Sequence, residues 1–449
     1  MPILIKPISG WGRYPVQTCK LERPERYADL RPDTDSVIAR GQGRSYGDAT
    51  LNENRLVLLT ERVNRLLEFD VASGILRAEA GTTLAEILPV IMPKGWFLPV
   101  TPGTKFVSLG GCVAADVHGK NHHHEGSFGD YVVALDLILS DGSRALCSPS
   151  EKAELFWATI GGMGLTGIIG EVTIQLIPIQ SVHLMVRHRR ADNLEQLFQL
   201  LQSPASDDRY TVAWIDSMAS GAQLGRGITM SGHHAEVGEL PGNFQGSIKP
   251  GRSRSIPFDF PTLVLNRFSI SAFNSRYFKR EGARSSPFLS GYDSFFYPLD
   301  AISNWNRMYG KHGFVQYQCV IPEATSFEGM RKLLEELSNS RRPSFLAVLK
   351  RLGTQGRGLL SFPMSGYTLA LDLPIRDEGL FPLLNKLDEI VLQHGGRVYL
   401  AKDARLSAES FRVMYPRYDE WLRIKQAVDP QNRFSSSLSR RLEIGGNAS

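Results

Sequence analysis

The sequence is poor in cysteine and has no long hydrophobic run, and these two absences exclude several classes of protein. Its 449 residues include only four cysteines, which lie far apart and form no Cys-x-x-Cys pair. This spacing argues against a zinc site or a disulfide scaffold, so reduced thiols are expected at Cys19, Cys112, Cys147 and Cys319. No stretch approaches the roughly 20 apolar residues of a membrane-spanning helix. Early prolines break the N-terminus, so no secretory signal is recognisable and a cytoplasmic location is expected.

Charge of one sign and familiar ligand motifs are also scarce. The net charge is +5 and the basic residues are scattered, so nucleic acid is not an expected partner. No Gly-x-Gly-x-x-Gly opens a helix after a strand, as the turn of a Rossmann fold does, and the Gly-Lys-Ser/Thr of a Walker loop does not occur. The run His122-His123-His124 invites a metal assignment, but consecutive loop residues rarely all face one ion. No metal site is therefore predicted.

What is present indicates a folded, enzyme-sized chain of two domains, or three. Apolar residues make up 42% and charged residues 22%, which allows a sizeable core. Up to residue 182, short aliphatic strand candidates alternate with glycine loops, and one helix is expected from Leu84 with Thr82 or Thr83 as its cap. From residue 183, helices and strands of a second sheet alternate. The predicted fold class is α+β.

The second part of the chain contains clear helical periodicity. One helix is expected after an Asp192 cap, a second has Phe327 on its apolar face, and others cover residues 380–391 and 418–428. Residues 238–290 are rich in Gly, Pro, Ser and Arg and show little periodicity. This stretch predicts either a loop over a site or a surface insertion.

Two glycine-rich stretches are the strongest chemical signal. The first, "RGQGRSYGD" at 40–48, follows a strand candidate, and its bare backbone could form a nest for phosphate oxygens, with charge-assisted bonds from Arg40 and Arg44. Taken alone, it fits a tight turn on a basic surface equally well. The second stretch, residues 102–132, is rich in glycine and histidine and includes Lys120. Two separated glycine loops suit a long dinucleotide lying between two subdomains.

Strand parity predicts a polar face on the second sheet. In "FVQYQCVIP", Gln316 and Gln318 point to one side, and in "YTLALDL", Thr368, Ala370 and Asp372 share a side. An antiparallel sheet usually turns such a face to solvent. The alternative is that the face covers a ligand.

Several motifs occur together and in order along nearly the whole chain. They are "RGQGRSYGD", "ELFWATIGGMGLTGI", "NWNRMYGKHGFVQYQ", "LSFPMSGYTLALDLPI" and "GGRVYLAKDARLSAESFRVMYPRYDEW". In these motifs the chain resembles the decaprenylphosphoryl-β-D-ribose 2'-oxidases, the flavin half of a two-enzyme epimerase that makes lipid-linked arabinose.

The resemblance implies an FAD-binding domain of the vanillyl-alcohol-oxidase (PCMH) type with two α+β subdomains. This domain would span residues 1–182 and be completed by a C-terminal segment, residues 396–449. Residues 183–395 would form an inserted substrate-binding cap domain, built on an antiparallel sheet flanked by helices.

The resemblance also implies which residues hold FAD. The first loop would grip the pyrophosphate and the second would surround the rest of the cofactor, with two further contacts from later in the chain. The implied residues are Gly41, Gly43, Arg44, Ser45, Tyr46, Gly47, Gly103, Ser108, Gly110, Gly111, Ala115, His118, Ile169 and Tyr399. Related oxidases attach FAD through a histidine at the position of Arg44. A guanidinium cannot form that linkage, so non-covalent FAD is expected.

The implied substrate ligands are Lys120, Gln318, Lys350 and Lys402, with Lys402 and Tyr46 as the preferred catalytic pair. Alcohol oxidation removes the O–H proton as hydride leaves the carbon. Lys402 would accept that proton if its pKa were lowered, or would otherwise stabilise the alkoxide as a fixed charge. Ala370 and Thr368 stand where mycobacterial enzymes carry cysteine and asparagine, which leaves the lipid and the sugar open.

The implied function is oxidation of the 2'-hydroxyl of a polyprenylphosphoryl-β-D-ribose to a ketone, for cell-envelope arabinose. The implied partner is a separate short-chain NAD(P)H-dependent reductase, and a lipid-linked substrate leaves room for peripheral contact with the inner membrane. Two alternatives stay open. One is an FAD-dependent aldonolactone or sugar-alcohol oxidase, and the other is a sugar-phosphate-binding protein without catalysis.

Overall fold

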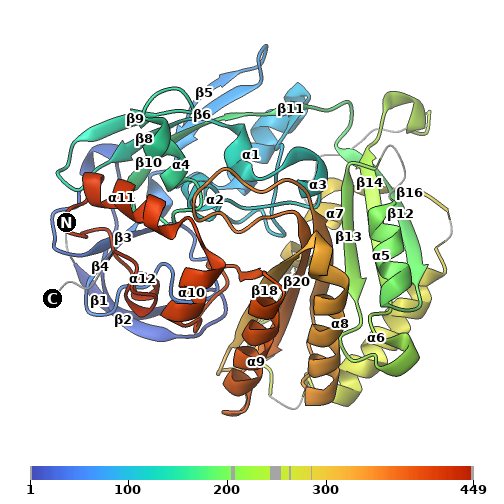
Figure 1. Ribbon diagram of the computed structural model, residues 1–449. Helices are drawn as coiled ribbons and strands as arrows, with labels where there is room; N and C mark the ends of the chain where they lie inside the picture. Colours follow the sequence, from blue (N-terminus) through green and yellow to red (C-terminus); the bar gives the residue numbers. More distant parts are fainter. Residues whose placement is uncertain (1–2, 204–207, 243–253, 262–263, 285, 446–449) are drawn as a thin grey trace.

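The computed structural model describes residues 3–203, 208–242, 254–261, 264–284 and 286–445. It contains two small sheets in the first part of the chain and one large sheet in the second (Figure 1). No helix in these ranges is long and apolar enough to cross a bilayer. All four cysteines are buried and free.

The first small sheet has four strands and carries the first glycine loop at one strand end. Its order is β1-β2-β4-β3, with β4 parallel to both of its neighbours. The strands are β1 (Leu4–Ser9), β2 (Val16–Glu22), β3 (Val37–Arg40) and β4 (Leu56–Leu59). The loop "GQGRSYGD" begins directly where β3 ends.

The second small sheet is antiparallel and has the order β5-β6-β10-β8-β9. Its strands are β5 (Leu66–Asp70), β6 (Ile75–Glu79), β8 (Val132–Ile138), β9 (Arg144–Cys147) and β10 (Ile168–Gln175). The helices of this part are α1 (Leu84–Ile91), α2 (Leu109–Ala114), α3 (His122–Glu125) and α4 (Ala153–Thr159). A short pair joins β7 (Trp96–Phe97) to β11 (Ile177–Pro178). Thr83 caps α1 through a capping box with Glu86, which settles the choice between Thr82 and Thr83.

The large sheet is antiparallel throughout, with the order β16-β12-β14-β13-β19-β20-β18-β21. Its strands are β12 (His183–Ala191), β13 (Tyr210–Ile215), β14 (Gly227–His234), β16 (Phe288–Gly291), β18 (Phe314–Pro322), β19 (Ala347–Leu352), β20 (Gly366–Pro374) and β21 (Arg397–Val398). The remaining short pair joins β15 (Arg254–Ser255) to β17 (Ile302–Ser303). The predicted α+β class with an antiparallel sheet flanked by helices is confirmed.

Helices cover the large sheet unequally. The helices α5 (Leu194–Gln202), α8 (Glu323–Ser340) and α9 (Leu380–Gln393) pack on the face that carries Tyr317 and Tyr367, and Phe198 of α5 stacks on Tyr367 at 4.2 Å between ring centroids. Helix α6 (Arg267–Gly282) lies on the opposite face, where its Phe278 packs with Trp214. The short α7 (Tyr292–Phe296) follows β16. The centre of that opposite face is left for the polar side chains of β18, β19 and β20.

Three local predictions in this part were wrong. Asp192 binds Arg190 through its carboxylate, and Asn193 caps α5 instead, accepting from Gln196 N at 3.0 Å. Phe327 is 43% exposed although it lies on α8. The stretch 238–290, which shows little periodicity, contains α6; the buried side of this helix is partly polar, so no apolar pattern marked it in the sequence. Residues 243–253, 262–263 and 285 of that stretch lie outside the described residues.

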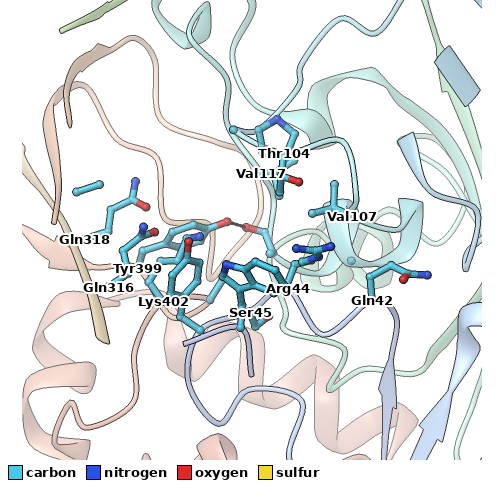
Figure 2. Close-up of a pocket in the computed structure, with 18 of the residues that line it drawn as sticks. Gln42, Arg44, Ser45, Thr104, Val107, Val117, Gln316, Gln318, Tyr399 and Lys402 are labelled. Atoms are coloured by element: carbon cyan, nitrogen blue, oxygen red, sulfur yellow. Dashed lines mark hydrogen bonds between the residues drawn. The ribbon is translucent and has the colours of Figure 1, made fainter. Parts of the chain in front are cut away.

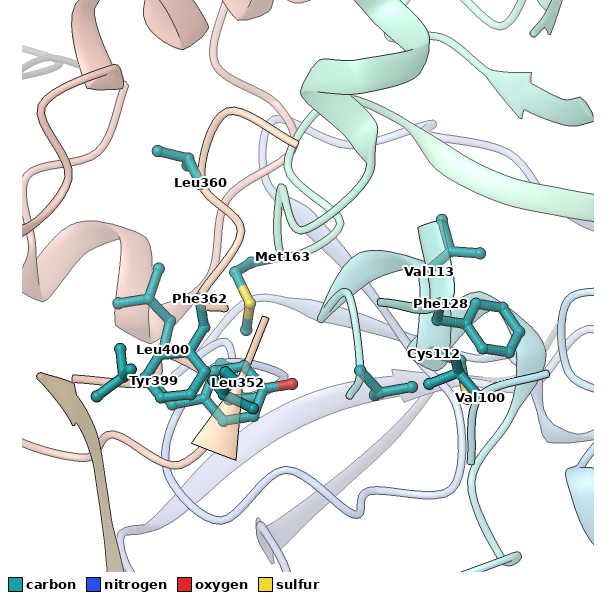
Figure 3. Packing of buried hydrophobic residues seen from close by; sticks show 14 of the residues in the cluster. Val100, Cys112, Val113, Phe128, Met163, Leu352, Leu360, Phe362, Tyr399 and Leu400 are labelled. Atoms are coloured by element: carbon teal, nitrogen blue, oxygen red, sulfur yellow. The ribbon is translucent and has the colours of Figure 1, made fainter. Parts of the chain in front are cut away.

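The last part of the chain packs against the first part. It consists of α10 (Ala408–Met414), α11 (Tyr418–Val428) and α12 (Ser437–Arg441). In α11, which has the predicted bounds, Trp421 Nε1 donates to Ala158 O of α4 at 2.8 Å. A single hydrophobic cluster links α2 with the chain around Tyr399, which stacks on Phe362 at 4.5 Å (Figure 3). The domain limits 182/183 and 395/396 remain predictions.

Candidate active site

A pocket lies between the two glycine loops and the free face of the large sheet. Its walls come from β18, β19 and β20, from the segment after β21, and from both loops. Figure 2 shows Gln316, Gln318 and Lys402 toward one end, and Arg44 and Gln42 toward the other. Fourteen of the residues predicted for the site line this pocket: Gly41, Gly43, Arg44, Ser45, Tyr46, Gly103, Ser108, Gly111, Ala115, His118, Gln318, Lys350, Tyr399 and Lys402.

The first glycine loop presents bare backbone to the pocket. Gly43 has φ +61°, a left-handed conformation that side chains disfavour, and a Cβ on Gly41 would overlap Ser108 of the second loop. Within the described residues, the backbone N–H groups of residues 42–45 have no hydrogen-bond acceptor. Four unpaired donors in succession form an anion-binding concavity of the kind that holds phosphate.

The second loop is fastened to the second small sheet, at the end of β6. Ser108 caps α2 by accepting from Gly111 N at 3.3 Å, while Gly110 N donates to Ala80 O at 2.8 Å. A Cβ on Gly110 would lie 2.9 Å from that of Ala80. Gly110 therefore allows the loop to pack on the strand end and does not itself line the pocket.

Gly47 also lies outside the pocket lining and has a packing role. A Cβ there would overlap the carbonyl oxygen of Asp403, so glycine lets the first loop run against the segment that carries Lys402. In the same contact Tyr46 N donates to Ala401 O at 3.0 Å. The backbone thus brings Tyr46 and Lys402 together, and Lys402 Nζ lies 4.0 Å from the Tyr46 ring centroid.

Two further predicted residues are not among the lining residues. Lys120 Nζ donates to the carbonyl oxygen of Phe295 and lies 4.3 Å from the Phe295 ring centroid. Ile169 is buried in β10, where it pairs with Leu137. The structure therefore does not bring either side chain to the pocket surface.

The two arginines of the first loop differ in their contacts. Arg44 lines the pocket and stacks on Trp11, with its guanidinium carbon 3.9 Å from the ring centroid. Arg40 turns away and donates to Ser9 O at 2.6 Å and to Thr50 Oγ1 at 3.1 Å. The expectation that Arg40 adds a charge-assisted bond to a ligand is wrong, because its guanidinium holds the chain behind the loop.

The predicted polar face of the large sheet is confirmed, and it is covered. Gln316 and Gln318 are only 7% and 4% exposed, which contradicts the solvent-facing alternative. Gln318 Nε2 lies 3.2 Å from Thr368 Oγ1 and 3.0 Å from His118 Nε2. Val348, Lys350 and Ala370 line the pocket beside them, as their register on β19 and β20 requires.

The lysines of the site share an environment that disfavours their charged forms. Burial lowers the pKa of Lys402 to about 7, helped by the charge of Lys350 and opposed by that of Asp372. Burial lowers the pKa of Lys350 to about 8, and burial with the charge of Lys350 lowers the pKa of Lys120 to about 7. Burial also holds the pKa of His118 well below its ordinary value, so its imidazole is neutral.

Sequence reasoning missed some residues of the site. Trp11 comes from a segment without any ligand-binding pattern, and no local signal pointed to it. Gln316 also lines the pocket, and its partner Asp372 lies behind it; both lie on the predicted polar face, so strand parity could have added them. Trp305 lines the pocket, whereas Trp214 packs in a cluster with Phe278.

The residues present fit FAD. The unpaired N–H groups of residues 42–45 suit its pyrophosphate, and the extended pocket between two loops suits a dinucleotide. The Nδ1 atom of His118 is buried and has no partner in the described part of the chain, which leaves a polar group for a ligand to satisfy. No group of three metal-ligating side chains occurs within the described ranges.

Comparison with known proteins agrees with this geometry. Residues 28–148 match the model of the FAD-binding domain, and residues 380–442 match that of D-arabinono-1,4-lactone oxidase. A xylooligosaccharide oxidase from Myceliophthora thermophila C1 has the same fold, with a TM-score of 0.69 over 96% of this chain and 93% of its own at 15% identity. The fold and the pocket therefore define an FAD-dependent oxidoreductase of the PCMH type, with FAD as its cofactor.

The full-length relatives narrow the class. The decaprenylphosphoryl-β-D-ribose oxidase of Mycolicibacterium smegmatis is 35% identical over 99% of this chain and 98% of its own. An L-gulono-1,4-lactone dehydrogenase of Mycobacterium tuberculosis is 20% identical over 95% and 94%. The chain belongs to the decaprenylphosphoryl-β-D-ribose oxidase family.

Proposed function

We propose that this protein oxidises the 2'-hydroxyl of a polyprenylphosphoryl-β-D-ribose to the 2'-ketone. The proposal rests on full-length similarity to an oxidase of that name. The observation that carries it is the meeting of Lys350, Gln318 and Lys402 on one pocket wall, opposite the glycine loops. A cationic, amide-bearing wall suits a phosphorylated sugar, because lysines bind phosphate oxygens and the amide binds hydroxyls.

Residues 42–45 would hold the FAD pyrophosphate through their backbone N–H groups, and when bound, FAD accepts the hydride from the alcohol carbon. Attachment is proposed to be non-covalent. Arg44 stands where related oxidases have the linking histidine, and its guanidinium is stacked on Trp11. His118 is not available for attachment through Nε2, which contacts Gln318.

Lys402 is proposed to take the hydroxyl proton. A pKa of about 7 leaves a substantial neutral fraction near physiological pH, which an ordinary lysine would lack. Tyr46 lies against its ammonium and is buried, and burial keeps the pKa of this phenol well above its ordinary value. Tyr46 is therefore neutral and can orient the reacting hydroxyl without competing for the proton.

Lys350 is proposed to bind the phosphoryl or sugar oxygens together with Gln318. Lys120 does not line the pocket, because its ammonium donates to Phe295 O. It interacts with the charge of Lys350 and adds positive charge to the same region. Its proposed part is electrostatic and does not require contact with the substrate.

The ketone product requires a second enzyme. The Gly-x-Gly-x-x-Gly match at residues 162–167 follows α4 and leads into β10, the reverse of the strand-to-helix turn that binds NAD(P)H. A separate short-chain reductase is therefore proposed to complete the epimerisation. Contact with the inner-membrane surface is proposed on the chemistry of the lipid-linked substrate alone.

Anaerobic mixing of the FAD-loaded protein with farnesylphosphoryl-β-D-ribose tests the function. The flavin absorbance should bleach, and the pentose should gain a keto group. The match to a D-arabinono-1,4-lactone oxidase model at residues 380–442 favours one competing function, oxidation of an aldonolactone. Bleaching by L-gulono-1,4-lactone, with none by the prenylphosphoryl pentose, would establish that function instead.

A further inference from the structure

A carboxyl group lies buried directly behind the lysine side of the pocket. Asp372, on β20, is 0% exposed and is not among the pocket-lining residues. Its Oδ1 accepts from Gln316 Nε2 at 2.6 Å, and its Oδ2 accepts from the Tyr309 hydroxyl at 3.2 Å. Ser344 Oγ accepts from its backbone N–H at 3.1 Å. Burying an ionised carboxylate is costly unless charge or hydrogen bonds compensate it, so this position calls for a physical explanation.

The partners of Asp372 are held in place by aromatic packing. Tyr309 stacks on Phe314 with ring centroids 4.0 Å apart, and Tyr46 meets the same Phe314 edge-on at 5.4 Å. The Gln316 side chain also acts on the Tyr46 phenol, whose pKa it lowers against the larger effect of burial. Asp372 is thereby connected through Gln316 to the tyrosine on which Lys402 lies.

Hydrogen-bonding capacity fixes the orientation of the glutamine amide. An ionised carboxylate only accepts, so Gln316 must turn its NH₂ group to Asp372 and its Oε1 away from it. Gln316 is itself a lining residue, so Oε1 is the end of the amide that remains for another partner. The carboxylate thus selects which end of the amide the substrate meets.

The charges around Asp372 are few. Lys402 is the cation that acts on it, Tyr309 and Tyr46 are neutral phenols, Gln316 and Ser344 are neutral, and Lys350 acts on Lys402 from β19. Burial raises the pKa of Asp372 to about 7, while the bonds from Gln316 and Tyr309 and the charge of Lys402 favour its ionised form. Among the described residues, Lys402 has no ion pair at contact distance, and Asp372 is the carboxyl whose charge favours its ammonium.

We propose that Asp372 is a positioning residue for proton transfer: it stabilises the ammonium that Lys402 becomes on taking the hydroxyl proton, and it orients Gln316 toward the substrate. In that step the substrate O–H bond breaks and an N–H bond forms at Lys402 Nζ, while Asp372 neither gains nor loses a proton. This inference rests on the role of Lys402 in the proposed function.

The inference can be tested without a substrate. Trace acetylation of the FAD-loaded protein over a pH series, followed by peptide mass spectrometry, gives the pH midpoint at which Lys402 becomes reactive. In Asp372→Asn the midpoint should fall by about 1 pH unit, because a nearby opposite charge is lost. In Tyr309→Phe it should fall less, since only one bond to the carboxylate is removed. Asp388→Asn is the matched control: Asp388 is a buried carboxyl that pairs with Arg405, and its loss should leave the Lys402 midpoint unchanged.

The same variants are then compared in anaerobic flavin bleaching. Asp372→Asn should lower the limiting rate by about tenfold, which corresponds to about 1.4 kcal/mol. The substrate concentration for half-maximal rate should rise by a smaller factor. An unchanged Lys402 midpoint in both Asp372→Asn and Tyr309→Phe would overturn the inference, and Tyr309→Phe decides alone if Asp372→Asn does not fold. A failure of the proposed function would instead show as no bleaching by the parent protein, with the labelling shift intact.

Discussion

Replacing Lys402 with methionine is the most informative single perturbation of the site. Methionine keeps the length of the side chain and its packing on Tyr46, but it removes the amine. A positioned general base contributes about 10²–10⁴-fold to a rate. At about 1.36 kcal/mol per decade, the variant should lose about 2.7–5.4 kcal/mol of transition-state stabilisation. FAD should still bind, because backbone groups of the glycine loop hold it.

The assay is stopped-flow reduction of the flavin without oxygen, measured over a pH series. A base must be neutral to work, so the parent rate should rise with pH through about 7 and then level off, in step with the pKa of Lys402. A lysine acting as a fixed charge would give the opposite sign, since its ammonium is lost over the same rise. The methionine variant should show no such titration.

Two results would refute the reasoning about Lys402. One is a variant that reduces its flavin at the parent rate, and the other is a parent rate that falls as the pH rises through 7. Lys350→Met serves as the comparison, because removing a charge from the phosphate side should mainly raise the substrate concentration needed for half-maximal rate.

Gly43→Val should raise the dissociation constant of FAD by about tenfold or more, because Gly43 has φ +61° and a side chain there would strain the loop that binds the pyrophosphate. Fluorescence titration with FAD measures the constant, and an unchanged value would contradict the placement of the pyrophosphate at this loop. Acid precipitation should release all the FAD into the supernatant, given that Arg44 cannot link it, and yellow pellets would disprove this. Lys425→Met should lower the free energy of unfolding by about 3–5 kcal/mol, because it leaves the fully buried carboxylate of Asp429 without its ion-pair partner at 2.5 Å. Urea unfolding measures the change, and a loss of less than about 1 kcal/mol, as at a surface pair, would contradict this prediction.

Short-range patterns predicted much of the site because they encode backbone geometry directly. The glycines of residues 41–47 are needed for left-handed turns and close approach, and those demands are visible in the sequence. Gln316 and Gln318 were placed on one face by the two-residue period of a strand, which holds whatever the strand packs against. The resemblance to a family supplied the roles of Lys350 and Lys402.

What could not be predicted depends on contacts between distant segments. Lys120 was expected at the substrate, but its ammonium is taken by the Phe295 carbonyl, 175 residues away in sequence. Helix α6 was hidden because its buried side includes Asn274 and Glu281, which find partners in Asp216 and Arg284. Asp192 and Asn193 are both acceptable caps by residue type, and the pairing of Asp192 with Arg190 decides between them.

The central claim is that hydride leaves C2' of a prenylphosphoryl ribose in the pocket between the glycine loops and Lys402. Its most direct test is the rate of anaerobic flavin bleaching with farnesylphosphoryl ribose carrying deuterium at C2', compared with the same compound deuterated only at C5'. Slower bleaching with the 2'-deuterated substrate alone is predicted. Equal rates for the two compounds, or no bleaching by either in a protein that demonstrably binds FAD, would contradict the account.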